Sequence, residues 1–138
     1  MNLTAPFLLG QAYGPRMAAR GWGRIVNIAS QQAIRAFDSS GGYGVSKAGI
    51  CALTRSQAEA WSPDGVCCNA IAPGFVRTPL TRAVFDDPAR AAAMAGRTLV
   101  GRNGELADFA GIAVFLAGPA SGYLTGQTIF VDGGFSVA

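Results

Sequence analysis

Two short apolar runs, separated by a long helical pattern, constrain the fold of this 138-residue chain more than any other feature. Residues 24–29 and 66–72 are each typical of a strand that is buried on both faces. Residues 43–61, between them, are rich in alanine and other good helix formers. A strand–helix–strand order with buried strands predicts a right-handed crossover and a parallel sheet. A third strand is expected at 127–132.

The rest of the chain predicts helices that cover this sheet. The sequence shows no internal repeat, no low-complexity tract and no domain linker, so we expect a single α/β domain over residues 1–138. The other expected elements are helices at 2–20, at 79–98 with a break near Pro88, and at 105–117, a loop at 31–42 and a turn at 62–65.

Composition excludes several classes of function. The net charge of +3 comes from scattered arginines rather than a basic stripe, so nucleic acid is not an expected partner. No apolar run reaches the ~18 residues of a transmembrane helix, and the start lacks the pattern of a secretory signal. We therefore expect a cytoplasmic protein that does not bind membranes. The chain has no histidine, which excludes histidine-based triads and histidine-ligated metals.

The three cysteines are Cys51, Cys67 and Cys68. They form no C-x-x-C pattern, so no metal site is expected. Cys67 and Cys68 are adjacent in a predicted strand, where successive side chains point to opposite faces. We expect all three to be buried, reduced thiols that act as small apolar side chains.

The single lysine of the chain, Lys47, follows Tyr43 by four residues. Ten arginines carry the remaining positive charge, which indicates a task for Lys47 that arginine cannot perform. Residues four apart lie on the same face of a helix, and a nearby cation favours the anionic form of a phenol. Tyr43 is therefore a candidate proton donor and acceptor. The alternative is a packed tyrosine and a solvated lysine on an ordinary helix.

Several candidate residues are expected at one edge of the sheet. Ser30 follows the strand at 24–29, Pro73 and Gly74 follow the next strand, and Tyr43 opens the intervening helix. Ligands of parallel sheets bind beyond the carboxyl ends of the strands, so these residues are predicted to share a site. The alternatives are a cap for Ser30 and a plain turn for Pro73-Gly74. We interpret Asp132-Gly-Gly134 as a turn after the last strand.

With these residues the chain resembles the short-chain dehydrogenase/reductase family nearly from end to end. Ser30, Tyr43 and Lys47 match the family's catalytic serine, tyrosine and lysine in spacing, and Asn2 resembles the asparagine that completes its tetrad. The resemblance implies a Rossmann-like three-layer α/β/α parallel sheet, of which this chain holds the last three strands with their flanking helices. Two further segments carry the resemblance: Asn69-Ala-Ile-Ala-Pro73-Gly74-Phe-Val76-Arg-Thr78, and Tyr123-Leu-Thr-Gly-Gln-Thr-Ile-Phe-Val-Asp132-Gly-Gly134.

The resemblance also implies hydride transfer between NAD or NADP and a small alcohol or carbonyl substrate, in a homo-oligomer (dimer or tetramer). Tyr43 would exchange the proton with the substrate oxygen, and Ser30 would hold that oxygen. Lys47 would favour the phenolate and bind the nicotinamide ribose, and Asn2 would position a water for Lys47. The implied cofactor-binding residues are Tyr43, Lys47, Pro73, Gly74, Val76 and Thr78, and the implied substrate-binding residues are Ser30 and Tyr43.

The nucleotide-binding half of such an enzyme is not recognisable in the sequence. It should begin with a strand, a glycine-rich turn and a helix that binds the pyrophosphate. Neither Gly101-Arg-Asn-Gly104 nor Gly41-Gly-Tyr-Gly44 fits that pattern. We therefore expect the carboxyl-terminal catalytic part alone, with well over ~60 residues absent. Our hypothesis is that Met1 is an internal valine codon read as a start, or that the gene is truncated.

Three other interpretations remain open. The first is a catalytically inactive fragment that acts at most as an assembly or binding module, through the helix at 43–61. Its strand at 24–29 would lack a neighbour, and such an edge recruits other chains. The second is a hydrolase that uses Ser30 and Lys47, although no G-x-S-x-G motif is present. The third is a nucleotide sensor without activity. A sugar, polyol, steroid or acyl-thioester substrate is compatible with the sequence, and segments 31–42 and 79–98 are expected to shape its pocket.

Overall fold

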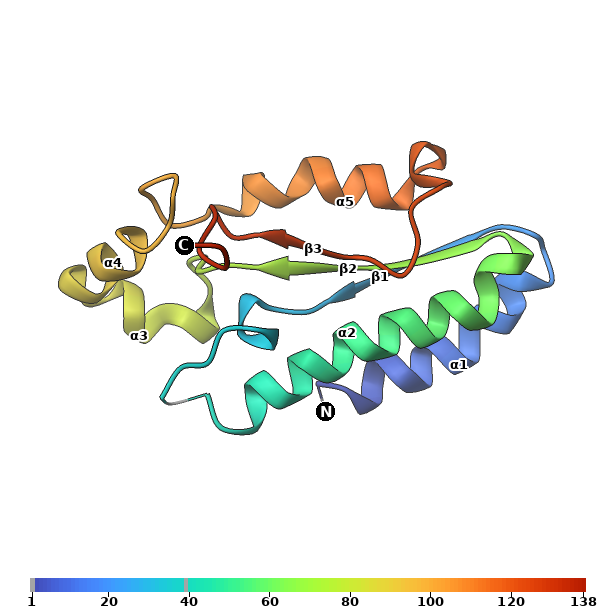
Figure 1. Ribbon diagram of the computed structural model, residues 1–138, viewed down its shortest axis with the longest axis horizontal. Coiled ribbons are helices and arrows are strands. Elements are labelled where there is room, and N and C mark those ends of the chain that lie inside the picture. The colour runs from blue at the N-terminus through green and yellow to red at the C-terminus, as the bar shows by residue number, and fades with distance from the viewer. Residues whose placement is uncertain (1, 39) are drawn as a thin grey trace.

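The three predicted strands form one parallel sheet. In the computed structural model, which describes residues 2–38 and 40–138, β1 (Gly23–Ile28), β2 (Val66–Pro73) and β3 (Thr128–Val131) lie in the order β1-β2-β3. The register pairs Gly23 with Val66 and Ala70 with Thr128 (Figure 1). The hypothesis about Met1 lies outside the described residues.

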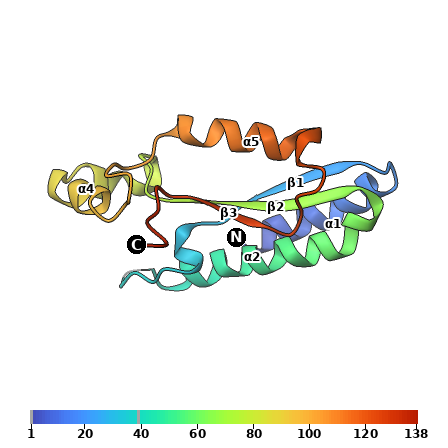
Figure 2. The same ribbon diagram turned by 45° about the horizontal axis from the view of Figure 1, so that its top comes forward.

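Helices cover both faces of this sheet. α1 (Thr4–Ala18) and α2 (Gly42–Trp61) lie on one face, and α5 (Ala110–Ala117) lies on the other (Figures 1 and 2). The short helices α3 (Arg82–Phe85) and α4 (Pro88–Ala95) stand beyond one end of the sheet. This is the three-layer α/β/α arrangement that the family resemblance implies, over the three strands of this chain.

Two predicted helices are less regular than expected. The 79–98 segment divides into a 3₁₀ turn at Pro79–Thr81, then α3 and α4, and the break falls before Pro88 as predicted. The 105–117 segment begins with a 3₁₀ turn at Leu106–Phe109, and only its second half is α-helical. The predicted loop at 31–42 also contains a 3₁₀ turn, at Gln31–Ala33.

The prediction that the first strand is buried on both faces is wrong. β2 is the central strand and is buried from Val66 to Ala72, whereas β1 is half-buried at Arg24–Val26 and Ile28 is 53% exposed. The physical reason is position: β1 is an edge strand, and no described strand pairs with its outer side. Arg24 can be half-buried in this edge strand because its guanidinium donates hydrogen bonds to the carbonyls of Gly23 and Gly118.

The core lies between the sheet and the α1–α2 layer. One cluster contains Ile50 with alanines of β2, and the other contains Trp61 with Val66 and Cys68. Gly14 of α1 lies directly against Trp61, since a β-carbon there would be 2.5 Å from the indole ring. A glycine at this position is therefore what lets α1 approach α2 closely enough to cover the indole.

The cysteines largely match expectation. All three are free thiols; Cys67 and Cys68 are buried, while Cys51 is only half-buried. Burial, with a smaller contribution from Cys67, raises the pKa of the Cys68 thiol to about 12. In the described chain, no helix is long and apolar enough to cross a bilayer, and no three metal-binding side chains cluster.

Candidate active site

The predicted site residues converge beyond the carboxyl ends of the strands, at the left-hand end of the sheet in Figure 1. A cavity of about 770 Å³ opens there, within the range of small-molecule sites. Ser30, Tyr43 and Gly74 all line it, although they come from three separate parts of the chain. The parallel topology brings them together, as the sequence predicts.

Ser30 is buried at the end of β1, with an extended backbone. Its hydroxyl oxygen accepts a hydrogen bond from the amide of Gln32 at 3.2 Å and caps the following 3₁₀ turn. The capping alternative is therefore correct as a description of local structure. It does not use the hydroxyl proton, which has no acceptor among the described residues and remains available to a ligand.

Tyr43 and Lys47 share one face of α2, as their spacing predicts. The Lys47 ammonium lies 5.7 Å from the centre of the Tyr43 ring and donates to the carbonyl of Ile28 at 2.8 Å. Burial lowers the pKa of the Lys47 ammonium below its ordinary value, against a smaller opposing effect of Cys51. Because Ile28 ends β1, this hydrogen bond holds the lysine head group at the same rim as Ser30.

Asn2 contacts the first turn of α2 through Ser46, a residue that the sequence analysis did not select. Its side-chain amide donates to the Ser46 hydroxyl at 3.4 Å, and that hydroxyl donates to the Tyr43 carbonyl at 2.7 Å. No hydrogen bond joins Asn2 to Lys47 among the described contacts. The feature of the sequence that could have indicated Ser46 is its position three residues after Tyr43, because a serine in a helix can donate a hydrogen bond to the carbonyl three residues before it.

The segment after β2 is closely held. Gly74 faces the backbone of Asp132, since a β-carbon at Gly74 would lie 2.8 Å from the Asp132 α-carbon. Thr78 and Thr81 form a reciprocal capping box, and the Thr81 hydroxyl also donates to the carbonyl of Val76. Pro73-Gly74 is therefore a strand end whose shape is set by tertiary contacts. Thr81 is a second residue that the sequence did not single out.

Asp132 itself builds the turn after β3 and confirms that interpretation. Its carboxylate accepts hydrogen bonds from the amides of Gly134 and Ser136. This turn places Phe135 against Phe37 and Phe75, and the Arg97 guanidinium lies 4.3 Å from the centre of the Phe135 ring. The aromatic cluster packs next to the cavity, which Phe37 and Phe75 also line.

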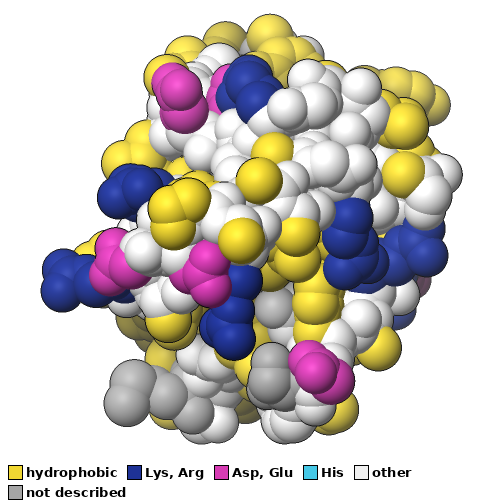
Figure 3. All heavy atoms as spheres, turned by 90° about the vertical axis from the view of Figure 1, so that its left-hand side faces the viewer, with side chains coloured by type: hydrophobic (Ala, Val, Ile, Leu, Met, Phe, Trp, Pro, Cys, Tyr) yellow, Lys and Arg dark blue, Asp and Glu magenta, His cyan; other side chains and the backbone are white. Residues whose placement is uncertain are grey.

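The remaining cavity wall comes from the two segments that the sequence named. The 31–42 segment contributes polar residues, among them Gln32, Asp38 and Ser40, and the 79–98 segment contributes Leu80, Met94 and Arg90. Figure 3 shows this end of the molecule, where apolar side chains lie among arginines or lysines and a few carboxylates. The wall is therefore mixed, with an apolar surface and charged groups at its mouth.

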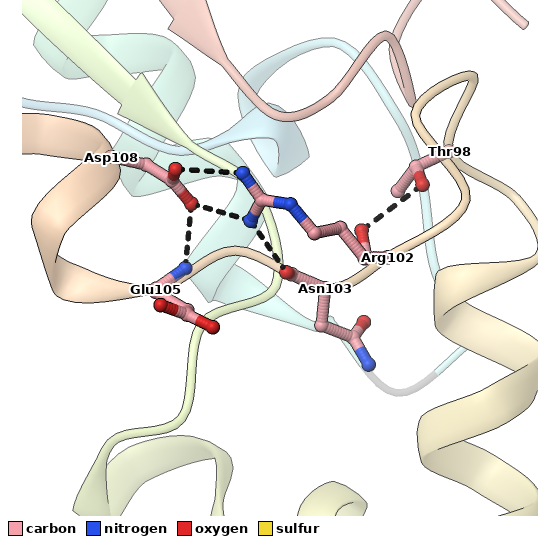
Figure 4. A network of polar contacts seen from close by, with 5 residues as sticks. All are labelled: Thr98, Arg102, Asn103, Glu105 and Asp108. Atoms are coloured by element: carbon pink, nitrogen blue, oxygen red, sulfur yellow. Dashed lines mark hydrogen bonds and ion pairs between the residues drawn. The ribbon is translucent and has the colours of Figure 1, made fainter.

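A polar network around Arg102 and Asp108 orders the loop that contacts the segment after β2 (Figure 4). Arg102 donates two hydrogen bonds of 2.8 Å to the Asp108 carboxylate, which also accepts from the amide of Glu105. These hydrogen bonds, that from Arg102 first, hold the pKa of Asp108 well below its ordinary value. The network orders the loop in which Gly104 bridges to Val76.

Comparison with known proteins decides the family. The family model described as Enoyl-(Acyl carrier protein) reductase matches residues 1–136. The chain belongs to the short-chain dehydrogenase/reductase family. A tropinone reductase homolog of Arabidopsis thaliana is 37% identical over 136 residues, which cover 99% of this chain and 44% of the relative. The 2-dehydro-3-deoxy-D-gluconate 5-dehydrogenase of Bacillus subtilis (strain 168) is 40% identical over 135 residues, which cover 98% of this chain and 53% of the relative.

A solved structure extends the likeness to three dimensions. The gluconate 5-dehydrogenase of Burkholderia cenocepacia J2315, in complex with NADP and tartrate, matches with a TM-score of 0.96 and 39% identity. The match covers 99% of this chain and 54% of that protein. This member of the short-chain dehydrogenase/reductase family thus spans about half the length of the curated relatives and solved structures that it matches.

Proposed function

We propose that residues 1–138 form the carboxyl-terminal catalytic part of an NAD(P)-dependent oxidoreductase that acts on an alcohol or a carbonyl group. One observation carries the proposal: Ser30 and Tyr43 line one cavity, and the Lys47 ammonium lies 5.7 Å from the centre of the Tyr43 ring while it donates to the carbonyl of Ile28 at the end of β1. Relatives named as dehydrogenases and reductases support the class of reaction.

The roles follow from the chemistry of each side chain. The Tyr43 phenol gives a proton to a carbonyl oxygen, or takes one from an alcohol. The free hydroxyl proton of Ser30 donates to that same oxygen. The Lys47 ammonium favours the phenolate by its charge, and its lowered pKa reflects a half-buried position. Proton transfer by a positioned side chain contributes about 10²–10⁴ in rate.

The chain fits the nicotinamide end of a dinucleotide. Lys47 offers hydrogen-bond donors at the rim, and the closely held segment from Pro73 and Gly74 through Val76 to Thr78 offers backbone groups and a hydroxyl. When bound, NAD or NADP would supply or accept the hydride. Among the described residues, 2–38 and 40–138, no glycine-rich turn of the kind that binds a pyrophosphate follows a strand.

Asn2 has a positioning role in this proposal. Its amide donates to the hydroxyl of Ser46, the residue before Lys47, and that hydroxyl donates to the Tyr43 carbonyl. From there it would order a water next to the Lys47 ammonium.

The proposed protein is a cytoplasmic homo-oligomer, a dimer or a tetramer. Exposed apolar side chains on α1, Phe7, Leu8 and Tyr13 among them, support an interface between copies. The three free cysteines suit a reducing compartment. Sedimentation of the purified protein tests the oligomer, and a monomer at all concentrations would contradict it.

The function is tested by hydride transfer. We would join residues 1–138 to the part of the Bacillus subtilis relative that they do not match. NAD(P)H oxidation would then be followed with a panel of carbonyl substrates. Tyr43→Phe removes only the proton-bearing oxygen and should abolish turnover, while Tyr123→Phe, at a fully exposed position outside the cavity lining, is the matched control. If Tyr43→Phe kept more than about a tenth of kcat, the role of Tyr43 would be wrong.

A further inference from the structure

We infer that the cavity selects a hydroxylated carboxylic acid, such as a sugar acid, and that Arg90 binds its carboxylate. This inference rests on the proposed function, because it takes the cavity beside Ser30 and Tyr43 as the substrate site. Two features of the structure support it. One wall of the cavity has a guanidinium whose terminal nitrogens donate to no described residue, and the other wall has polar side chains that can form further hydrogen bonds.

Arg90 is the one cation among the described residues that line the cavity. It lies in the first turn of α4, its side chain is 68% exposed, and only its Nε approaches a carboxylate, that of Asp87 at 3.4 Å. Asp87 in turn caps α4 by accepting from the amides of Ala89 and Arg90. The two terminal nitrogens of Arg90 donate to no described residue, so its planar fork can bind a carboxylate through two hydrogen bonds.

The opposite wall carries groups that suit hydroxyls. The Ser40 hydroxyl donates to the side-chain oxygen of Gln32 at 2.7 Å, which leaves the Gln32 amide nitrogen free to donate. Asp38 supplies an exposed carboxylate that can accept from hydroxyls. The segment that carries these residues and helix α4 lie on different sides of this end of the molecule (Figure 1). A ligand between them is oriented, with its carboxylate towards Arg90 and its hydroxyls towards Asp38.

Charge placement also argues against other substrates. A steroid would gain nothing from Arg90, Asp38 and Gln32, because it has no charge and few hydroxyls to pair with these exposed or half-exposed groups. A compact cation would be attracted by Asp38 but repelled by Arg90. A neutral polyol fits the hydroxyl-binding wall but gains nothing from the guanidinium charge. The carboxylate is thus the feature that distinguishes the substrate we infer from a polyol.

The test compares D-gluconate with D-sorbitol, which keeps the hydroxylated chain but ends in an alcohol instead of a carboxylate. Binding of each to the full chain is measured by saturation-transfer NMR, which needs no turnover. We expect D-gluconate to bind about tenfold more tightly, as one charge-assisted pair of hydrogen bonds provides. Added salt should weaken D-gluconate binding and leave D-sorbitol unchanged.

Substitutions connect the preference to Arg90. Arg90→Gln should abolish it, Arg90→Lys should keep part of it, and Arg82→Gln, an exposed arginine of α3 outside the cavity lining, should leave it intact. Unchanged circular dichroism would show that each variant folds, as expected for exposed positions. Equal binding of the two ligands, no binding of either, or a preference that survives Arg90→Gln would overturn the inference.

The outcomes also separate this inference from the proposed function. Arg90-dependent binding of D-gluconate, with neither NAD(P)H oxidation by the carbonyl panel nor NAD(P)+ reduction by alcohols including D-gluconate in the joined protein, would refute the oxidoreductase and leave the binding site standing. Hydride transfer from polyols and sugar acids alike to NAD(P)+, unaffected by Arg90→Gln, would refute the binding site and leave the oxidoreductase standing.

Discussion

Replacement of Gly74 by alanine should disturb the end of the sheet that forms the cavity. A β-carbon at Gly74 would lie 2.8 Å from the α-carbon and 2.9 Å from the β-carbon of Asp132, whereas carbon atoms pack at about 3.5–4.0 Å. Asp132 cannot move aside freely. Its carboxylate holds the amides of Gly134 and Ser136, and the preceding Val131 carbonyl accepts from the Gly74 amide at 3.1 Å.

The cost is that of overpacking against backbone, about 1–3 kcal/mol. The displacement should pass to Phe135, which is buried and packs on Phe37 and Phe75 beside the cavity. We would measure denaturant unfolding by circular dichroism and map the change by hydrogen–deuterium exchange. Peptides that cover 128–138 should lose protection in Gly74→Ala.

Gly111→Ala is the matched control. This glycine lies within α5, and a β-carbon there would meet no atom within 4 Å. Because alanine favours a helix over glycine by about 1 kcal/mol, the control should be neutral or stabilised. If Gly74→Ala were as stable as the unaltered chain and as well protected over 128–138, the close approach of Gly74 to Asp132 would be wrong.

Four further predictions concern lysine chemistry, a buried thiol and the sheet edge. Lys47→Arg keeps the charge but cannot place a compact ammonium on the Ile28 carbonyl, so hydride transfer should fall severely; near-normal kinetics would show that charge alone suffices. Cys68 should resist iodoacetamide at about pH 8 until the chain unfolds, whereas half-buried Cys51 reacts first, as mass spectrometry would show. The pKa of the Cys68 thiol is higher in the folded state than in the unfolded chain, so the neutral thiol favours the folded state. The free energy of unfolding should therefore fall as the pH rises from 9.0 towards about 12. Cys68→Ala should make that fall smaller. Residues 1–138 alone should associate through β1 and show no NAD(H) or NADP(H) binding by calorimetry; light scattering from a monodisperse monomer, with micromolar binding of either dinucleotide, would contradict this.

Local pattern was enough to predict most of the regular elements. The strands at 24–29 and 66–72 and the helix at 43–61 were each placed to within a residue at either end, because continuous burial and helical periodicity are written in neighbouring residues. The i,i+4 spacing put Tyr43 and Lys47 on one face for the same reason. Parallel topology then predicted that Ser30 and Gly74 meet them at the rim.

Contacts between distant segments could not be predicted in this way. The half-exposed state of β1 depends on which strand lies beside it, and the 3₁₀ turns of 79–98 and 105–117 depend on what each segment packs against. The roles of Ser46 and Arg90 likewise depend on Asn2, 44 residues away from Ser46, and on a cavity wall built from other elements.

The sequence by itself therefore determined the class of fold, the order of its elements and the residues that carry the candidate chemistry, since each of these follows from spacing along the chain. The tertiary structure alone decided how much of β1 is covered, why glycine is required at position 74, and which side chains line the cavity. Those properties are distances between atoms far apart in sequence, and no local pattern encodes them.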